Sequence, residues 1–374
     1  MSEVLEEHLD YLSLTGRAAR FAEAFLKTIN PSDIVADLGC GVGVLGLLAL
    51  SAGARRVWGL DQSDAIELAR ETIKRQGLAE QYLCLRGSTF TTELPERVDL
   101  LVCDHVGYFG LDYGIVAMVA DARRRFLKPG GRVIPRQIIL RLAAASGPGD
   151  KLVEAWARQS VPGELHWIRE RAANAKHRHT FVEDELCSPP AELGAVALDQ
   201  DTPDLLRYGA QLAITRDCTL DGLAGWFDCE LAPGVWMTNS PLVADRIERP
   251  NAFLPCREPF DVRAGDVIDV SVKITHEPFT ISWTIRDPAS GKNHRHSTWS
   301  NIVLDPADLA GRDLKPVSLS PKGAARKAIL KAADGSRTLE EIEDAILRAH
   351  PGLFPTEAAI RRFVRREIRD GFKW

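Results

Sequence analysis

The stretch VADLGCGVG, Val35–Gly43, decides the fold of this 374-residue chain. It opens with apolar residues of the kind that form a buried parallel strand. It then places Gly39, Gly41 and Gly43 where a strand must turn tightly into a helix and where a ligand must approach the backbone. A second apolar run ends in Asp61, eighteen residues after Gly43, and this carboxylate suits ribose hydroxyls. The combination predicts a site for a dinucleotide or an adenosyl cofactor.

Helical and strand-like segments alternate around the glycine loop. Apolar residues recur at helical spacing over 17–29, and Asn30-Pro31 ends that helix. The same analysis predicts strands over 34–38, 57–60, 82–86, 98–103 and 132–134, and helices over 45–52, 64–76 and 114–127. We therefore predict an α/β fold, with a Rossmann-like doubly wound sheet and an N-terminal helix in residues 1–135.

The pattern changes after Pro135. Short β-type runs separated by Pro, Gly and Asp predict an antiparallel β-barrel domain over 136–315. Residues 151–175 are helical in pattern and look like an insertion in this domain. A small helical module is predicted over 316–374, with helices near 322–333, 338–348 and 356–369. Examples of the β-type runs are 138–143, 208–214, 225–231, 234–238, 267–274 and 280–285.

Charge and composition exclude several classes of protein. A net charge of -5 argues against a general binder of nucleic acid or anionic membranes, which needs a surplus of Lys and Arg. No apolar run reaches the roughly 18 residues of a membrane span, and the acidic start is unlike a signal peptide, so we expect a cytoplasmic protein. The seven widely spaced cysteines include no CxxC, so we expect neither a disulfide framework nor a bound metal.

Two details favour S-adenosylmethionine over a dinucleotide as the cofactor. Asp37 lies at the junction of strand and loop, where an acid suits a ligand that carries an ammonium group rather than a pyrophosphate. The stretch LKPGG, residues 127–131, forms a tight turn between the last crossover helix and a strand.

These residues resemble a class I methyltransferase, and specifically the protein arginine methyltransferase family. The resemblance rests on residues 35–43 with GARRVWGLD at 53–61, and it covers about residues 8 to 300. His8 and Arg17 are nine residues apart, as in the family's motif, where the Arg meets the carboxylate of the cofactor. Further matches are VDLLVCDHVGY at 98–108, which leads into the family's acidic active-site loop, and the barrel landmarks at 225–228, 238–241 and 262–266.

The resemblance implies S-adenosylmethionine as cofactor and a set of residues that bind it. It also implies a homodimer, because the family usually dimerises through an arm, and 151–175 is a place where such an arm could lie. The cofactor-binding residues that we predict are His8, Arg17, Asp37, Gly39, Cys40, Gly41, Gly43, Leu60, Asp61, Gln62, Ser88, Thr89 and Asp104.

The predicted catalytic loop departs from the family. Methyl transfer is an in-line displacement, so the protein mainly has to orient the nucleophile and remove its proton. In the family two glutamates grip the guanidinium of the acceptor. Their places fall here on Asp104 and on Tyr113, with Asp112 beside the latter, and a shorter acid with a phenol cannot form the same bidentate clamp. His105 and Tyr108 are candidates for proton handling, and a structural role for His105 is an equal alternative.

We therefore expect a methyltransferase that acts on an altered acceptor. The candidates are a side-chain nitrogen or oxygen of a peptide, including a ribosomal natural-product precursor, or a small amino-acid-like molecule. Genuine arginine methylation is the close alternative, and a scaffold that binds the cofactor without catalysis is another.

A second departure lies in the barrel domain. The Thr-His-Trp loop of the family falls on Arg246-Ile247-Glu248, so the His and Trp that wall the arginine channel are absent. Arg246 or Glu248 could bind a carboxylate or an amide of the substrate, with solvated loop charges as the alternative. We interpret the histidine pairs at 177–179 and 294–296 as solvated loops rather than metal ligands, and the tryptophans at 226, 236, 283 and 299 as barrel core or rim.

The C-terminal tail differs from the rest of the chain in its family resemblance and in its charge. Residues 329–342 resemble the helical half of a PqqD-like winged-helix module, a family that captures leader peptides as an added strand. Only 314–319 is available here for strands, and residues 316–374 hold 12 Lys and Arg against 8 Asp and Glu. A basic face on the last helix is interpreted as a dock for a leader peptide or an acidic partner, with a solvated face as the alternative. It comprises Arg361, Arg362, Arg365, Arg366 and Arg369, opposite Ile360, Val364 and Ile368.

Overall fold

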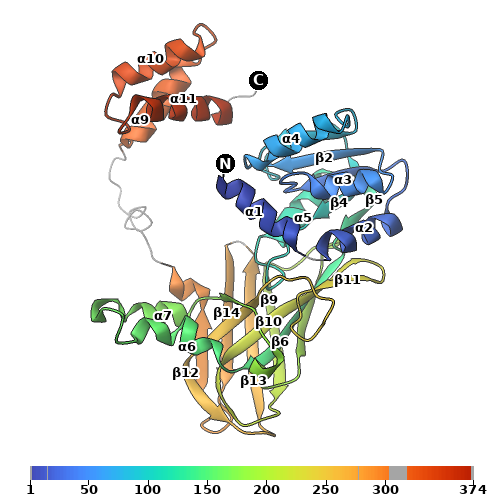
Figure 1. Ribbon diagram of the computed structural model, residues 1–374, viewed down its shortest axis with the longest axis vertical. Coiled ribbons are helices and arrows are strands. Elements are labelled where there is room, and N and C mark those ends of the chain that lie inside the picture. Colours follow the sequence, from blue (N-terminus) through green and yellow to red (C-terminus); the bar gives the residue numbers. More distant parts are fainter. Residues whose placement is uncertain (1, 15, 277, 303–317, 372–374) are drawn as a thin grey trace. The chain divides into compact units, whose positions relative to one another are not determined.

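A computed structural model describes residues 2–14, 16–276, 278–302 and 318–371. The chain divides into two compact units, Met1–Ile302 and Val303–Trp374. The first unit contains a parallel sheet flanked by helices, followed by long antiparallel strands, and the second is helical in its described part (Figure 1).

The parallel sheet confirms the predicted α/β fold. Its strands run in the order β3-β2-β1-β4-β5, with all neighbours parallel. All five residues of β1 are buried, because the strand lies at the centre of a sheet covered on both faces. The carboxyl ends of β1, β2 and β4 therefore meet at one edge, where ligands of such sheets bind. The elements are β1 (Ile34–Leu38), β2 (Arg56–Asp61), β3 (Tyr82–Arg86), β4 (Val98–Cys103), β5 (Leu127–Ile134), α1 (Ser2–Ser13), α2 (Arg17–Thr28), α3 (Val44–Ser51), α4 (Ala65–Arg75) and α5 (Ile115–Arg125).

Two antiparallel sheets follow, in the orders β7-β12-β10-β6-β8, with β11 on β10, and β15-β14-β13-β9. Four of these strands were not predicted, namely β7, β8, β12 and β15. In β12, Pro255 and Pro259 interrupt the apolar alternation, so the sequence there does not look like a strand. The strands are β6 (Gln137–Ala145), β7 (His177–His179), β8 (Ala191–Ala197), β9 (Leu205–Ala213), β10 (Cys218–Ala232), β11 (Val235–Thr238), β12 (Asn251–Val262), β13 (Val267–His276), β14 (Phe279–Arg286) and β15 (Asn293–Ser297).

The helical pattern predicted over 151–175 is broken into short pieces. These pieces are α6 (Pro148–Leu152), η1 (Glu154–Ala157), η2 (Gly163–Leu165) and α7 (Ile168–Ala173). Pro162-Gly163 lies in the middle of the pattern, and this pair favours a turn over a continuous helix. Ala172 and Ala173 pack with Trp226 and Phe253 in a small core of their own.

The expectation that the histidines at 294 and 296 lie in a solvated loop is wrong. Both lie on β15 and are only 7% exposed. Strand geometry turns residues two apart to one face, and there His294 stacks on Phe260 and His296 on Trp283. Trp226 and Trp283 are buried, whereas Trp236 and Trp299 are exposed. The other pair lies on β7, where His179 contacts the carboxylate of Glu185 at 3.0 Å. No cluster of three or more potential metal ligands occurs among the described residues.

The second unit contains α9 (Pro321–Ala332), α10 (Leu339–Ala349) and α11 (Glu357–Gly371), close to the predicted helices. Thr338 and Glu341 cap α10 reciprocally, as a capping box. The basic face predicted on α11 is partly neutralised, because Arg361 and Arg365 both pair with the buried carboxylate of Glu343. The predicted strand at 314–319 falls mainly on residues outside the described part, so the PqqD-like module stays a prediction.

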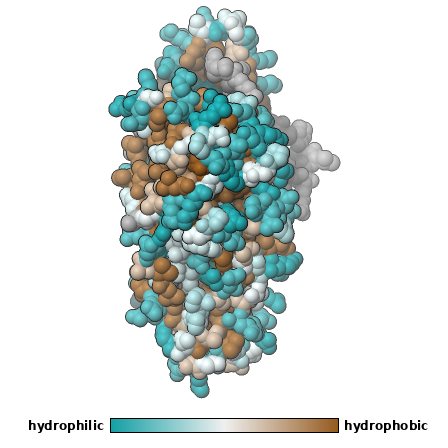
Figure 2. Space-filling model, turned by 90° about the vertical axis from the view of Figure 1, so that its right-hand side faces the viewer, coloured by the Kyte–Doolittle hydropathy of each residue, from teal (hydrophilic) through white to brown (hydrophobic). Residues whose placement is uncertain are grey.

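The surface carries both hydrophobic and hydrophilic side chains. On the face shown in Figure 2, hydrophobic residues form several patches among hydrophilic ones. Large exposed apolar side chains include Leu9, Leu26, Trp167 and Trp299. Within the described ranges, no helix combines the length and the apolar character needed to span a membrane.

Candidate active site

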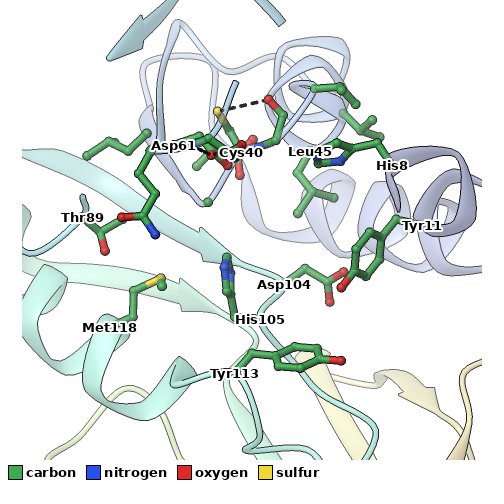
Figure 3. A pocket seen from close by; sticks show the side chains of 18 of the residues that line it. His8, Tyr11, Cys40, Leu45, Asp61, Thr89, Asp104, His105, Tyr113 and Met118 are labelled. Atoms are coloured by element: carbon green, nitrogen blue, oxygen red, sulfur yellow. Dashed lines mark hydrogen bonds between the residues drawn. The ribbon is translucent and has the colours of Figure 1, made fainter. Parts of the chain in front are cut away.

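A cavity of about 390 Å³ lies at the carboxyl ends of β1, β2 and β4. His8, Tyr11 and Leu12 reach it from α1, and the glycine loop and Asp61 form another wall (Figure 3). Gly43, the N-cap of α3, does not line the cavity. Sequence reasoning missed Tyr11, Leu12, Val42, Val44, Leu45, Ser63, Gly87, Phe90 and Met118. Of the predicted cofactor residues, those that line it are His8, Arg17, Asp37, Gly39, Cys40, Gly41, Leu60, Asp61, Gln62, Ser88, Thr89 and Asp104.

At the first two positions of the glycine loop, both the backbone conformation and the lack of space for a side chain require glycine. Gly39 and Gly41 have φ angles of 70° and 53°, in the left-handed region that side chains disfavour. A Cβ on Gly39 would overlap the ring of His105, and one on Gly41 would lie 2.6 Å from Cε1 of His8. The two histidine rings therefore pack directly on the loop.

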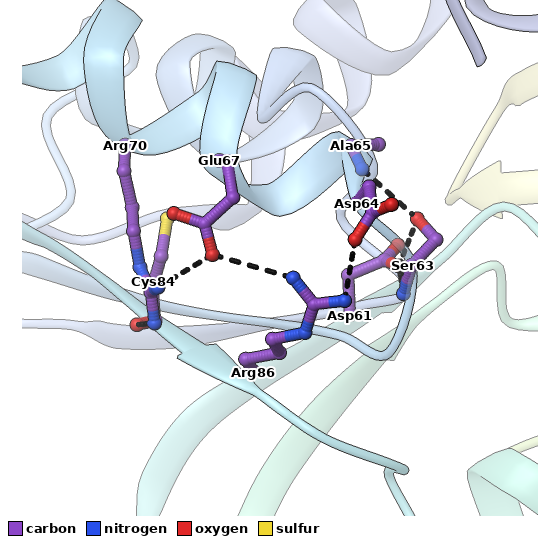
Figure 4. A network of polar contacts seen from close by, with 8 residues as sticks. All are labelled: Asp61, Ser63, Asp64, Ala65, Glu67, Arg70, Cys84 and Arg86. Atoms are coloured by element: carbon purple, nitrogen blue, oxygen red, sulfur yellow. Dashed lines mark hydrogen bonds and ion pairs between the residues drawn. The ribbon is translucent and has the colours of Figure 1, made fainter. Parts of the chain in front are cut away.

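The carboxylate of Asp61 is held rigidly at the edge of the cavity. Its Oδ2 accepts from the backbone N–H of Gly41 at 2.8 Å, and its Oδ1 accepts from the N–H and the Oγ of Ser63, both at 2.7 Å. Beside it, Arg86 pairs with Asp64 at 2.6 Å (Figure 4). A carboxylate accepts about four hydrogen bonds. Asp61 therefore retains acceptor capacity for a ligand hydroxyl.

The side chain of Asp37 on β1 forms hydrogen bonds that link the sheet to α3. Its Oδ2 accepts from the N–H of Gly46 at 2.9 Å and from the hydroxyl of Tyr82 at 3.1 Å. The side chain is buried, and burial raises the pKa of Asp37 to about 7. Its role toward an ammonium group of a ligand stays a prediction.

This raised pKa predicts a pH-dependent stability. Between about pH 4 and pH 7 the folded protein holds a proton on Asp37 that the unfolded chain releases, so raising the pH through this window favours unfolding, by about 3 to 4 kcal/mol at most. Asp37→Asn keeps an acceptor for both donors and is expected to lose this part of the pH dependence. Urea unfolding of both proteins at pH 4.5 and 7.5 measures it, and equal pH dependence in the two would contradict the expectation.

The first acidic position, Asp104, is neutralised from two sides. It follows β4 directly, and its Oδ2 pairs with Nε of Arg17 on α2 and lies 3.6 Å from Nη2 of Arg249. Arg249 also donates to the carbonyl oxygen of Val106. All three charged side chains are about nine-tenths buried or more. Sequence reasoning missed Arg249, because an arginine next to a proline in a loop carries no distinguishing signal.

The second acidic position carries no free carboxylate. Asp112 is not among the lining residues; it accepts from the N–H of Phe109 at 2.6 Å and pairs with the ammonium of Lys176. Tyr113 does line the cavity, and its hydroxyl accepts from Nη2 of Arg178 at 3.1 Å. At the position that corresponds to the second glutamate of the family, the structure therefore has the phenol of Tyr113, which is hydrogen-bonded to Arg178.

Residues 35–131 match the family model described as "Methyltransferase domain". The chain contains an S-adenosylmethionine-dependent methyltransferase domain. It is 33% identical over 143 residues to "Probable protein arginine N-methyltransferase 6" of Arabidopsis thaliana, covering 38% of this chain and 33% of that protein. It is 36% identical over 205 residues to "Probable protein arginine N-methyltransferase 6.2" of Oryza sativa subsp. indica, covering 53% and 52%. The matches thus span a third to about half of these curated relatives.

A solved structure shares the fold. It is titled "Trypanosoma brucei PRMT1 enzyme-prozyme heterotetrameric complex with AdoHcy" and matches with a TM-score of 0.70 at 20% identity. The match covers 78% of this chain and 97% of that chain. The likeness therefore extends beyond the methyltransferase domain into the antiparallel sheets.

Of the remaining predicted residues, one lines the cavity and three do not. His105 lines the cavity, and burial lowers its pKa, so the ring is neutral at pH 7. Tyr108 is not a lining residue; its hydroxyl donates to the carbonyl oxygen of Lys176 at 3.3 Å. Arg246 donates to the carbonyl oxygen of Pro241, Glu248 is exposed, and neither lines the cavity. Their substrate roles stay predictions.

The donor set of the cavity fits the cofactor. The hydrogen-bonded carboxylate of Asp61 suits a ribose hydroxyl, the guanidinium of Arg17 suits a carboxylate, and the glycine loop leaves the backbone open to close approach.

Proposed function

We propose that the protein transfers a methyl group from S-adenosylmethionine to an acceptor other than an arginine guanidinium. The acceptor is a side-chain nitrogen or oxygen of a peptide, such as a ribosomal natural-product precursor, or a small amino-acid-like molecule. One observation carries this proposal: each carboxylate of the acidic loop is already paired with an internal cation. Arg17 and Arg249 hold Asp104, and Lys176 holds Asp112. An incoming guanidinium would therefore meet cations before a free acid.

The protein's own residues provide orientation and proton transfer. The cofactor supplies an electrophilic methyl group on a positively charged sulfur. Arg17, Asp61 and the glycine loop would hold it and would orient its methyl group toward the acceptor. His105 is neutral and lines the cavity beside Asp104, so a ring nitrogen can take the proton of an acceptor amine or hydroxyl.

The names of the curated relatives favour a second candidate, methylation of arginine in a peptide or as the free amino acid. Labelled S-adenosylmethionine separates the two candidates. We expect no label on free arginine or on an arginine-containing peptide, and label on at least one member of a panel of other amines, alcohols and acids built on amino acids. Label on arginine that disappears in Asp104→Ala would establish the second candidate instead.

No label on any acceptor, together with intact cofactor binding by calorimetry, would favour a scaffold that binds the cofactor without catalysis. The homodimer and the docking of a leader peptide or an acidic partner on the C-terminal module are further proposals. Arg362 of α11 would contribute positive charge to such docking.

A further inference from the structure

The acceptor end of the cavity carries an unusual cation. Figure 3 shows Tyr113 on the side of the cavity away from Asp61 and Cys40. The phenol hydroxyl of Tyr113, which lines the cavity, accepts one of the five N–H groups of Arg178, so this guanidinium lies next to a lining residue. Arg178 is exposed, and no carboxylate whose side chain the structure describes forms an ion pair with it. Arg178 also interacts with the hydroxyl of Tyr108, and its exposed guanidinium has further donors for a ligand.

A second cation, Lys176, lies close to Arg178. The guanidinium of Arg178 lies 5.4 Å from the centre of the Tyr108 ring, and the ammonium of Lys176 lies 3.8 Å from the same ring. Two cations thus share one aromatic ring, and only Lys176 has an acid, Asp112, as partner. Burial and the charge of Arg178 lower the pKa of Lys176 to about 7, as expected for a positive charge in excess.

The balance of charge around the acceptor end is therefore positive. Four cations, Arg17, Arg249, Lys176 and Arg178, lie around two acids, Asp104 and Asp112. Arg178 is the member of this set that forms no ion pair with a described carboxylate, so it is the cation left for the acceptor when Arg17 binds the carboxylate of the cofactor. The planar fork of a guanidinium binds a carboxylate through two parallel hydrogen bonds, and a neutral amide cannot reproduce this pairing.

We propose that the methyl acceptor carries a carboxylate and that Arg178, held by Tyr113, binds it. This inference rests on the proposed function and names its substrate class. The carboxylate belongs either to a free amino-acid-like molecule or to an acidic residue of a peptide, and the chemistry of recognition is the same in both.

Calorimetry on the full-length protein saturated with S-adenosylhomocysteine tests the proposal with simple probes. Succinate is expected to bind at least about tenfold more tightly than succinamide, its neutral diamide, and guanidinium is expected not to bind. Arg178→Gln is expected to weaken the affinity for succinate about tenfold. Arg207→Gln, an exposed arginine on β9 in the other antiparallel sheet, is the matched control and is expected to leave that affinity unchanged.

A second variant covers a failure of Arg178→Gln to fold. Tyr113→Phe keeps the ring but removes the hydroxyl that holds Arg178, and it is expected to weaken succinate binding by a smaller factor, about threefold. Equal binding of succinate and succinamide, tighter binding of guanidinium, or full succinate affinity in a folded Arg178→Gln would overturn the proposal.

The two possible sources of the carboxylate are separated by a pair of ligands. N-acetyl-aspartate methylamide represents the small molecule, and a twelve-residue peptide with one Asp and blocked ends represents the peptide. Binding of either, lost in Arg178→Gln, supports the proposal and identifies the source, whereas binding of neither contradicts it. Titration with S-adenosylmethionine is read separately, so a missing cofactor site, which would contradict the proposed function, is distinguished from a missing carboxylate site.

Discussion

Arg249→Met is expected to lower the free energy of unfolding of the Met1–Ile302 unit by about 3 to 5 kcal/mol. Arg249 is 8% exposed, and it serves both the carboxylate of Asp104 and the carbonyl oxygen of Val106. Methionine fills much of the same volume but donates no hydrogen bond. The buried carboxylate would keep only Arg17 as a charged partner, and the carbonyl would lose its donor.

Urea denaturation monitored by tryptophan fluorescence measures this loss. Arg246→Met is the matched control, because Arg246 lies three residues earlier in the same loop, is half-buried and donates only to the carbonyl of Pro241. Its free energy of unfolding should change by about 1 kcal/mol or less. If the two variants lost the same stability, the Arg17–Asp104–Arg249 cluster would not be the buried ion network that we describe.

Asp61→Ala is expected to weaken the binding of S-adenosylmethionine about 10- to 100-fold. A hydrogen bond to a charged acceptor contributes about 1.5 to 3 kcal/mol, and each 1.4 kcal/mol corresponds to a tenfold change in affinity. The substitution also releases the N–H groups of Gly41 and Ser63, so the loop would lose the contacts that fix its shape.

Isothermal titration calorimetry measures the affinity, and Asp64→Ala provides the control. Asp64 carries the same charge three residues later and pairs with Arg86, but it is not a lining residue of the cavity (Figure 4). Its removal should change the affinity less than about threefold. An unchanged affinity in Asp61→Ala would mean that the cofactor does not use this carboxylate.

The strands and helices of the parallel sheet could be predicted because their signals are local. A continuous apolar run makes β1, and apolar residues at helical spacing make α2. The antiparallel region was predicted less completely, because the prolines of β12 hide its strand character and β7 is only three residues long. Similarly, Pro162-Gly163 ends a helix that the spacing alone would continue.

Most of the predicted cofactor-binding residues line the cavity, and they could be singled out because they lie within short motifs. The acceptor end could not be predicted in this way. Asp104 follows β4, Arg249 lies in the loop before β12, and Arg178 lies on β7. Asp104 lines the cavity, and only the packing of the sheets brings Arg249 next to it and Arg178 next to the lining residue Tyr113. The sequence identified the changed positions Asp104 and Tyr113, but it contained no signal for the arginines that face them.

Arg17 belongs to both halves of the cavity, because it is a lining residue and also the partner of Asp104. A ligand that binds the guanidinium of Arg17 in one half of the cavity alters the electric field in the other half. By thermodynamic reciprocity, the second ligand then alters the affinity for the first by the same factor. A change at position 17 is therefore expected to alter the cooperativity between cofactor and acceptor as well as either affinity.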